Sequence, residues 1–122
     1  MANELEEAEA CALASGAFEP RRGTAVYVDR SPRRAGATPL GSPAFRAAVR
    51  AVLVFRDEMP GANWMHPCSY ALVDPQTGVV LAQVRSDRPP AFGRLPPTWV
   101  LASDPDGLAD LVPRGGAPKA PR

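Results

Sequence analysis

The residues best suited to covalent chemistry lie together in segment 64–68 (WMHPC). His66 is the single histidine of the chain, and Cys68 is one of its two cysteines. A cysteine nucleophile needs a nearby base to ionise it and a third group to orient that base. In an extended segment His66 and Cys68 share one side, but Pro67 restricts the backbone between them. We therefore predict a structural loop here, and keep Cys68 and His66 as candidate catalytic residues of an alternative function.

The same histidine and cysteine would form a metal site only with a further ligand, because zinc sites in proteins use at least three side chains. Cys11 or Asp74 could supply it, yet no recognised ligand spacing is present. Segment 104–107 (DPDG) begins like a calcium loop, but Ala109 and Gly115 occupy the sixth and twelfth positions, where glycine and an acidic residue are needed. The sequence predicts no metal site and no cofactor.

Motifs of the common enzyme classes are missing from the chain. It contains neither of the glycine-rich phosphate-binding patterns GxxxxGK[ST] and GxGxxG. It also lacks the GxSxG turn that presents a nucleophilic serine. This pattern favours a non-catalytic function.

Charge is distributed unevenly, although the formal net charge is only +1. Residues 1–20 hold five glutamates and no basic residue, whereas residues 21–58 hold eight arginines and three acids. The arginines between Arg21 and Arg34 could contact phosphates, and Tyr27 could stack on a base. Tyr27, however, stands in an apolar VYV run, and the net charge falls short of the basic footprint of nucleic-acid-binding domains. We predict a core position for Tyr27 and no nucleic-acid partner.

No apolar run approaches the roughly 20 residues of a membrane-spanning helix, and the acidic N-terminus lacks the pattern of a signal peptide. We therefore expect a cytoplasmic protein that does not associate with membranes. In that compartment Cys11 and Cys68 are expected to stay reduced. A disulfide between them would depend on geometry that the sequence does not reveal.

The first 41 residues predict a helix, a strand and a loop. The helix is expected over residues 4–15, with Asn3 as its N-cap and Gly16 ending it in a left-handed turn. Residues 24–29 (TAVYVD) alternate and are β-branched, which predicts a strand. Residues 31–41, rich in proline, glycine and arginine, predict a loop.

The stretch from Pro43 to Glu58 fits two structures. Ser42 followed by Pro43 is a helix-start signal, and the apolar residues that follow recur with helical spacing. Against this, AVLVF at 51–55 has the composition of a buried strand. We favour the helix, because the start signal, the periodicity and the terminating Pro60 agree.

Residues 69–85 give the clearest pattern, two apolar runs flanking the turn sequence DPQTG at 74–78. Asp, Pro and Gly at these turn positions predict a β-hairpin. Its second strand is apolar on both faces and is therefore expected in the interior of a sheet. Residues 98–102 predict a last strand, 104–107 a turn and 108–112 one helical turn.

Together these elements predict an α+β fold. We expect a two-layer domain with a mostly antiparallel sheet of about four strands, one main helix and a short N-terminal helix. If Pro43 to Glu58 is a strand, the expectation becomes an all-β sandwich or barrel. The predicted organisation is an acidic helical extension (1–20), one globular domain (21–112) and a flexible Pro/Gly-rich tail (113–122).

These features favour a non-catalytic protein–protein interaction module, an accessory or regulatory subunit of a larger assembly that includes a protein partner or further copies of the chain. The Ala- and Arg-rich composition, with one lysine, favours a bacterial or phage source. Alternatives are a small enzyme using Cys68 and His66, and a regulated protease substrate cleaved at loop arginines. The candidate partner contacts are Leu5, Arg33, Arg34, Trp64 and Arg114.

Overall fold

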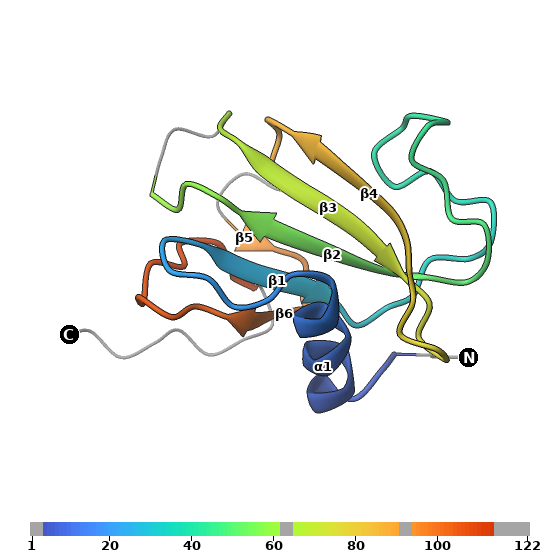
Figure 1. Ribbon diagram of the computed structural model, residues 1–122, viewed down its shortest axis with the longest axis horizontal. Coiled ribbons are helices and arrows are strands. Elements are labelled where there is room, and N and C mark those ends of the chain that lie inside the picture. Colours follow the sequence, from blue (N-terminus) through green and yellow to red (C-terminus); the bar gives the residue numbers. More distant parts are fainter. Residues whose placement is uncertain (1–3, 62–64, 91–93, 114–122) are drawn as a thin grey trace.

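The computed structural model describes residues 4–61, 65–90 and 94–113, which form a twisted antiparallel sheet with one helix against it (Figure 1). The sheet has five strands in the order β4-β3-β2-β1-β6. Their bounds are β1 Ala25–Asp29, β2 Val52–Asp57, β3 Cys68–Val73, β4 Val80–Ser86 and β6 Trp99–Ser103. The helix α1 spans Glu7–Ala17, and a short parallel pair joins β5 (Arg94–Leu95) to β7 (Val112–Pro113).

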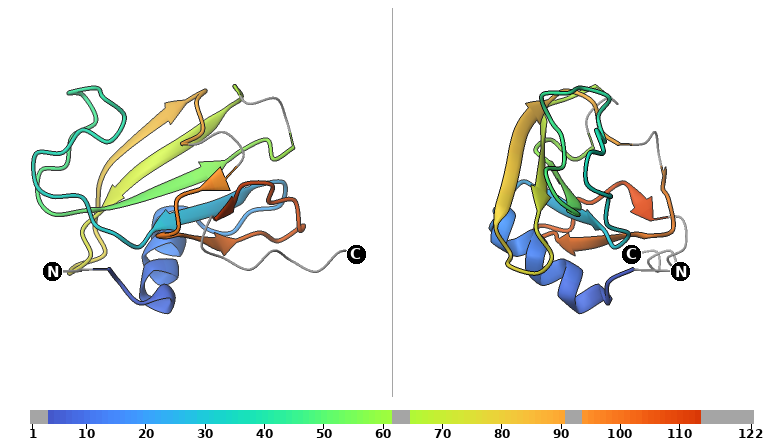
Figure 2. Two further views of the ribbon diagram at one scale, coloured as in Figure 1. Left: turned by 180° about the vertical axis from the view of Figure 1, so that it is seen from behind. Right: turned by 90° about the vertical axis from the view of Figure 1, so that its right-hand side faces the viewer.

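The two faces of the sheet are covered differently. Helix α1 lies on one face, while loops and the β5–β7 pair lie on the other (Figure 2). This is an α+β arrangement, as predicted, but the sheet has five strands rather than four, and α1 is the only helix in the described part of the chain. The barrel alternative does not apply, because β4 and β6 are separate edges of an open sheet.

The helix predicted between Pro43 and Glu58 is wrong. Strand β2 occupies the end of this stretch and pairs with β1 and β3. The residues before it fold back as a loop in which the Ala47 N–H donates to the Ala37 carbonyl (2.9 Å). The helix-start signal forms only a turn, with the Ala44 N–H bonded to Ser42 Oγ (3.2 Å). An interior strand buries both faces, so its apolar run lacks alternation and resembles a buried helix.

Helix α1 begins and ends later than predicted. Its N-cap is Glu6, which makes no side-chain cap bond, and the predicted N-cap Asn3 lies outside the described residues. Gly16 lies inside the helix, which ends at Phe18 in extended backbone. The helix packs through Ala10 and Ala14, whose small side chains allow the helix to lie close to the sheet. Residues 114–122 of the predicted tail are outside the described residues.

The predicted hairpin is confirmed as β3 and β4. Its turn is held by Asp74, whose carboxylate accepts the Gln76 N–H (2.9 Å) and whose carbonyl accepts the Gly78 N–H (2.8 Å). Gly78 has a φ of 77°, which residues with a Cβ rarely adopt. The hairpin's second strand, however, is not interior. It is the sheet edge, and Val80 and Val84 are exposed there, whereas every residue of β3 is buried.

The C-terminal part of the domain matches the predicted strand and turn but not the predicted helical turn. Strand β6 pairs with β1, and the Asp104 carboxylate accepts the N–H groups of Leu108 (2.8 Å) and Ala109 (3.1 Å). Residues 108–111 then continue without helix into β7. The Leu111 N–H donates instead to the Tyr27 hydroxyl (3.1 Å), which anchors this segment on the sheet.

The face without the helix is built on a row of aromatic side chains. Register pairs Tyr27 with Phe55 and Phe55 with Tyr70 on adjacent strands. The ring centroids of Tyr27 and Phe55 are 5.8 Å apart, and those of Phe55 and Tyr70 are 5.2 Å apart. Phe45, in the loop before β2, adds a ring contact with Tyr70 at 6.5 Å. All four rings are buried, and such pairs add about 0.5–1.5 kcal/mol each beyond their burial. The row therefore ties three strands and a long loop into one core.

Phe55 is the centre of this row, so we expect Phe55→Ala to lower the free energy of unfolding by about 3–5 kcal/mol. The matched control is Val79→Ala, because Val79 is 56% exposed and its truncation should change stability by about 0.5 kcal/mol or less. Urea denaturation followed by circular dichroism measures both. Equal, small effects of the two substitutions would contradict the described core.

Candidate functional site

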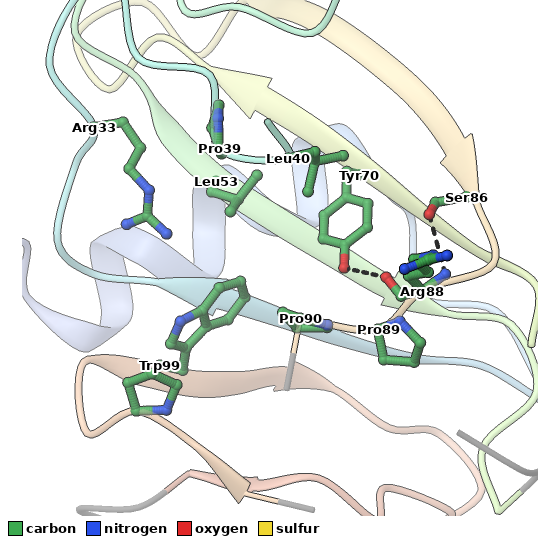
Figure 3. A pocket seen from close by; sticks show the side chains of 11 residues that line it. Arg33, Pro39, Leu40, Leu53, Tyr70, Ser86, Arg88, Pro89, Pro90 and Trp99 are labelled. Atoms are coloured by element: carbon green, nitrogen blue, oxygen red, sulfur yellow. Dashed lines mark hydrogen bonds between the residues drawn. The ribbon is translucent and has the colours of Figure 1, made fainter. Parts of the chain in front are cut away.

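A pocket of about 320 Å³ opens on the face of the sheet opposite α1 (Figure 3). Its floor consists of Leu53 from β2, Tyr70 from β3 and Trp99 from β6, which are all buried. Because these side chains extend from adjacent or nearby strands with fixed register, the floor is part of the core and is formed before any ligand arrives. The pocket combines an aromatic and aliphatic floor with a few polar groups, as ligand sites commonly do.

Two loops form the walls of the pocket. One follows β1 and contributes Arg33, Pro39 and Leu40; the other follows β4 and contributes Arg88 with the prolines at 89 and 90. In Figure 3 Arg33 lies at one end, near Trp99, and Arg88 lies at the other end, beside Ser86. The prolines restrict the backbone of both walls, so little conformational freedom remains to be lost when a ligand binds.

Arg33 is held by neighbours of its own loop and strand. Its Nη1 donates to the Asp29 carboxylate and to the Ser31 carbonyl (3.3 Å). Asp29 is buried, and its ion pair with Arg33 compensates both charges. Backbone bonds between Arg33 and Ala51 fix the loop in both directions (2.6 and 2.9 Å). The Arg33 side chain thus has a fixed position in the pocket wall, and Asp29 largely compensates its charge.

Arg88 differs, because its backbone is fixed while its charge is not compensated. The Tyr70 hydroxyl donates to the Arg88 carbonyl (2.6 Å), and the Arg88 N–H donates to Ser86 Oγ (3.1 Å). The side chain is exposed, and no ion pair or hydrogen bond joins its guanidinium to another described residue. The floor residue Tyr70 therefore places an available cation at the mouth of the pocket.

The polar side chains of the described lining are Arg33, Tyr70, Ser86 and Arg88. Among the described side chains that line the pocket there is no carboxylate, imidazole or thiol. Burial raises the pKa of the Tyr70 hydroxyl strongly, so this group stays protonated and serves as a hydrogen-bond donor. The site can accommodate an apolar group next to an anion.

The structure places His66 and Cys68 in different environments. His66 Nε2 lies 2.8 Å from Asp57 Oδ1, and both side chains are buried. Cys68 is fully buried in the core, and burial raises the pKa of its thiol to about 11. A thiol with this pKa is almost entirely protonated at neutral pH, whereas a nucleophilic cysteine needs a lowered pKa. The arrangement provides no activation of Cys68.

Asp57 was not singled out from the sequence, yet it is the partner of His66. It ends β2, where its Oδ1 also accepts the Met59 N–H (3.0 Å). Its Oδ2 is buried and has no hydrogen-bond partner among the described residues. Burial raises the pKa of this carboxyl above its ordinary value, although the bond from Met59 and the proximity of His66 oppose that change. His66 is therefore the main side-chain partner of the Asp57 carboxyl, whose burial is unfavourable for the stability of the fold.

The metal ligands considered from the sequence are not brought together. Cys11 lies on α1, and its thiol contacts the Leu101 carbonyl, whereas Asp74 lies in the β3–β4 turn. Within the ranges that the structure describes, no three His, Cys, Asp or Glu residues form a group that could hold a metal ion. Cys11 and Cys68 are both free thiols.

A second charged group lies on the sheet beside α1. Glu58 accepts hydrogen bonds from Ser69, Arg56 (3.3 Å) and Arg85 (3.5 Å). Burial alone would raise the pKa of Glu58, but these bonds outweigh it and the pKa is lowered. The Arg56 guanidinium also lies 4.6 Å from the centre of the Phe18 ring. One carboxylate faces two guanidiniums, so the group joins the helix to the sheet and keeps a net charge of +1, with the Arg85 side chain exposed.

The predicted partner contacts are scattered. Leu5 is half-buried and is bonded to Arg30 through both its N–H (2.9 Å) and its carbonyl (2.8 Å). Arg33 lines the pocket, and Arg34 is exposed on the same loop. Trp64 and Arg114 lie outside the described residues.

Sequence reasoning did not single out the floor residues Leu53, Tyr70 and Trp99, or Arg88 at the pocket mouth. Tyr70 and Trp99 were expected only as parts of strands, and Arg88 was not considered. The proline cluster that follows Arg88 was the available signal, since it indicates a rigid loop next to a charged side chain.

Comparisons of the chain with protein-family models, curated proteins and solved structures found no significant match. None of the helices among residues 4–61, 65–90 and 94–113 has the length and apolar character required to cross a bilayer.

We expect His66→Ala to lower the free energy of unfolding by about 3 kcal/mol at neutral pH, because it leaves the Asp57 carboxylate buried without its imidazole partner. Adding Asp57→Asn should recover part of that loss. Chemical denaturation of the wild type, the single variant and the double variant measures both effects.

The pH dependence has a defined sign. Burial raises the pKa of Asp57 in the folded state above its ordinary value of 3.8. The folded state therefore favours the protonated carboxyl, and this contribution to the free energy of unfolding is fully present below pH 3.8. It is lost as the pH rises through the folded-state pKa. In the His66→Ala background, the chain that also carries Asp57→Asn should therefore become progressively more stable than the chain retaining Asp57 as the pH rises from about 4 to 7. A constant difference across this range would contradict a buried, poorly supported carboxylate.

Proposed function

We propose that the protein is a non-catalytic interaction module that binds a partner protein through the pocket between the Arg33 and Arg88 loops. The observation that carries this proposal is the make-up of the described lining: a buried apolar floor, a guanidinium at the mouth that pairs with no other described residue, and no carboxylate, imidazole or thiol. Such a site gains free energy by burying an apolar side chain and by pairing one charge.

The fixed walls support this function. Arg33 is bonded to Asp29 and to Ala51, and the Arg88 backbone is bonded to Tyr70 and Ser86. A pocket that is formed in advance loses less conformational entropy on binding, which favours recognition by a small surface. In this proposal an apolar residue of the partner enters the pocket, and the surrounding loops contact the segment next to it.

The proposal predicts that Arg88→Glu reduces capture of the partner about tenfold or more while the fold is retained, because the substitution replaces the cation at the pocket mouth with a negative charge that repels the partner's anionic group. Arg21→Glu is the matched control, since Arg21 is also an exposed arginine and does not line the pocket. The tagged full chain and both variants are purified from the native host, and co-purifying proteins are quantified by mass spectrometry. Circular dichroism and light scattering verify the fold and the oligomeric state of each chain.

The expected result is a stoichiometric partner that is recovered with the wild type and with Arg21→Glu, and reduced about tenfold or more with Arg88→Glu. A monomeric protein without any stoichiometric partner would contradict the proposal. So would a partner that both variants retain equally, because binding would then occur elsewhere on the surface.

A further inference from the structure

We propose that the group recognised by the pocket is a carboxylate attached to an apolar body, with Arg88 as the carboxylate-binding residue and Tyr70 and Trp99 as the surfaces that hold the apolar part. The inference rests on the proposed function in that it uses the same pocket, and it adds the chemical class of the ligand. It is drawn from the charges, the hydrogen bonds and the shape of the lining.

The charges around the pocket favour one anionic group. Arg33 and Arg88 are the ionisable side chains of the lining apart from the tyrosine, and no acidic residue is among them. Asp29 already compensates Arg33, whereas the Arg88 guanidinium has no ion-pair or hydrogen-bond partner among the described residues. One uncompensated positive charge remains at the pocket mouth, and a hydrogen bond between ionised groups is about twice as strong as one between neutral groups.

This charge balance favours a carboxylate over a phosphate. A carboxylate carries one negative charge and matches the planar guanidinium with two parallel N–H···O bonds. A phosphate monoester carries about −1.5 to −2 at neutral pH and is typically bound by several cations or a row of backbone N–H groups. The pocket has one available guanidinium, and its walls contain prolines, which have no backbone N–H to donate.

The apolar floor of the pocket indicates that the ligand has an apolar part next to its carboxylate. Leu53, Tyr70 and Trp99 form an aliphatic and aromatic floor between the two arginines (Figure 3) and are 1–3% exposed, while Leu40 in the wall is 37% exposed and adds accessible apolar surface. Removing a side chain such as leucine or phenylalanine from water gains about 1.5–3 kcal/mol, which an acid as small as acetate cannot provide. The volume of about 320 Å³ lies at the low end of known ligand sites. It therefore fits a group the size of one amino-acid residue.

Two sources share this chemistry: the C-terminal apolar residue of a partner chain, and a free small organic acid. In both, the carboxylate pairs with Arg88 and the apolar part lies on the floor. In the first source the apolar residue is joined to a polypeptide chain, whereas in the second it is part of a free molecule. One set of probes can therefore test the shared chemistry and separate the two sources.

The experiment is calorimetric titration of the full chain with N-acetylphenylalanine and with N-acetylphenylalanine amide, which differ only in the carboxylate. We expect the amide to bind about tenfold or more weakly. Arg88→Gln should remove this preference, Arg88→Lys should restore part of it, and the control Arg21→Gln should leave it unchanged. Equal binding of acid and amide, absence of binding by both, or a preference that survives Arg88→Gln would overturn the inference.

A tetrapeptide ending in Gly-Gly-Phe with a free carboxylate separates the two sources. Binding at least as tight as that of N-acetylphenylalanine, and dependent on Arg88, would support the inference with a chain terminus as the source. Binding of N-acetylphenylalanine with exclusion of the peptide would support the inference with a small acid as the ligand, and would count against the proposed protein partner. If Arg88→Glu loses a partner protein while acid and amide bind equally, the proposed function stands and the carboxylate inference fails.

Discussion

The row of Tyr27, Phe55 and Tyr70 is the interaction on which the rest of the structure depends. One face of the sheet has a helix to cover it, whereas the other has loops and the short β5–β7 pair, and loops bury apolar area poorly unless large side chains beneath them supply it. The three rings provide that area across adjacent strands, and Phe45 extends it into the long loop between β1 and β2. Without the row the loops that form the pocket walls would have no surface to pack on.

The same row connects the core to the candidate site. Tyr70 uses its ring to complete the row and its hydroxyl to hold the Arg88 carbonyl, so one residue supplies the pocket floor and fixes the pocket mouth. At the far end of β2 the sheet buries Asp57 with His66 as its partner. That pair supports the segment leading into β3 and is separate from the pocket. His66 and Cys68 are thus buried away from the pocket, and the recognition surface that we propose is assembled from an arginine, aromatic residues and prolines.

The sequence predicted the elements whose signals are local and missed those decided by long-range pairing. The β3–β4 hairpin was predictable because Asp74 and Gly78 fix the turn chemically. The helix proposed for Pro43 to Glu58 failed because an interior strand has no alternation, and the partners that make β2 interior are distant in the chain. The pocket could not be predicted for the same reason: Arg33 and Arg88 are brought to one site only by the order of the strands.

The most direct test of this account is a nuclear Overhauser measurement on the aromatic rings of the full chain, which is tractable because the chain has only four phenylalanines and two tyrosines. The account predicts cross-peaks from the Phe55 ring to the rings of both Tyr27 and Tyr70, and from Tyr70 to Phe45. Cross-peaks from Phe55 to only one tyrosine, or none between Tyr70 and Phe45, would contradict the strand order and the loop packing from which the pocket follows.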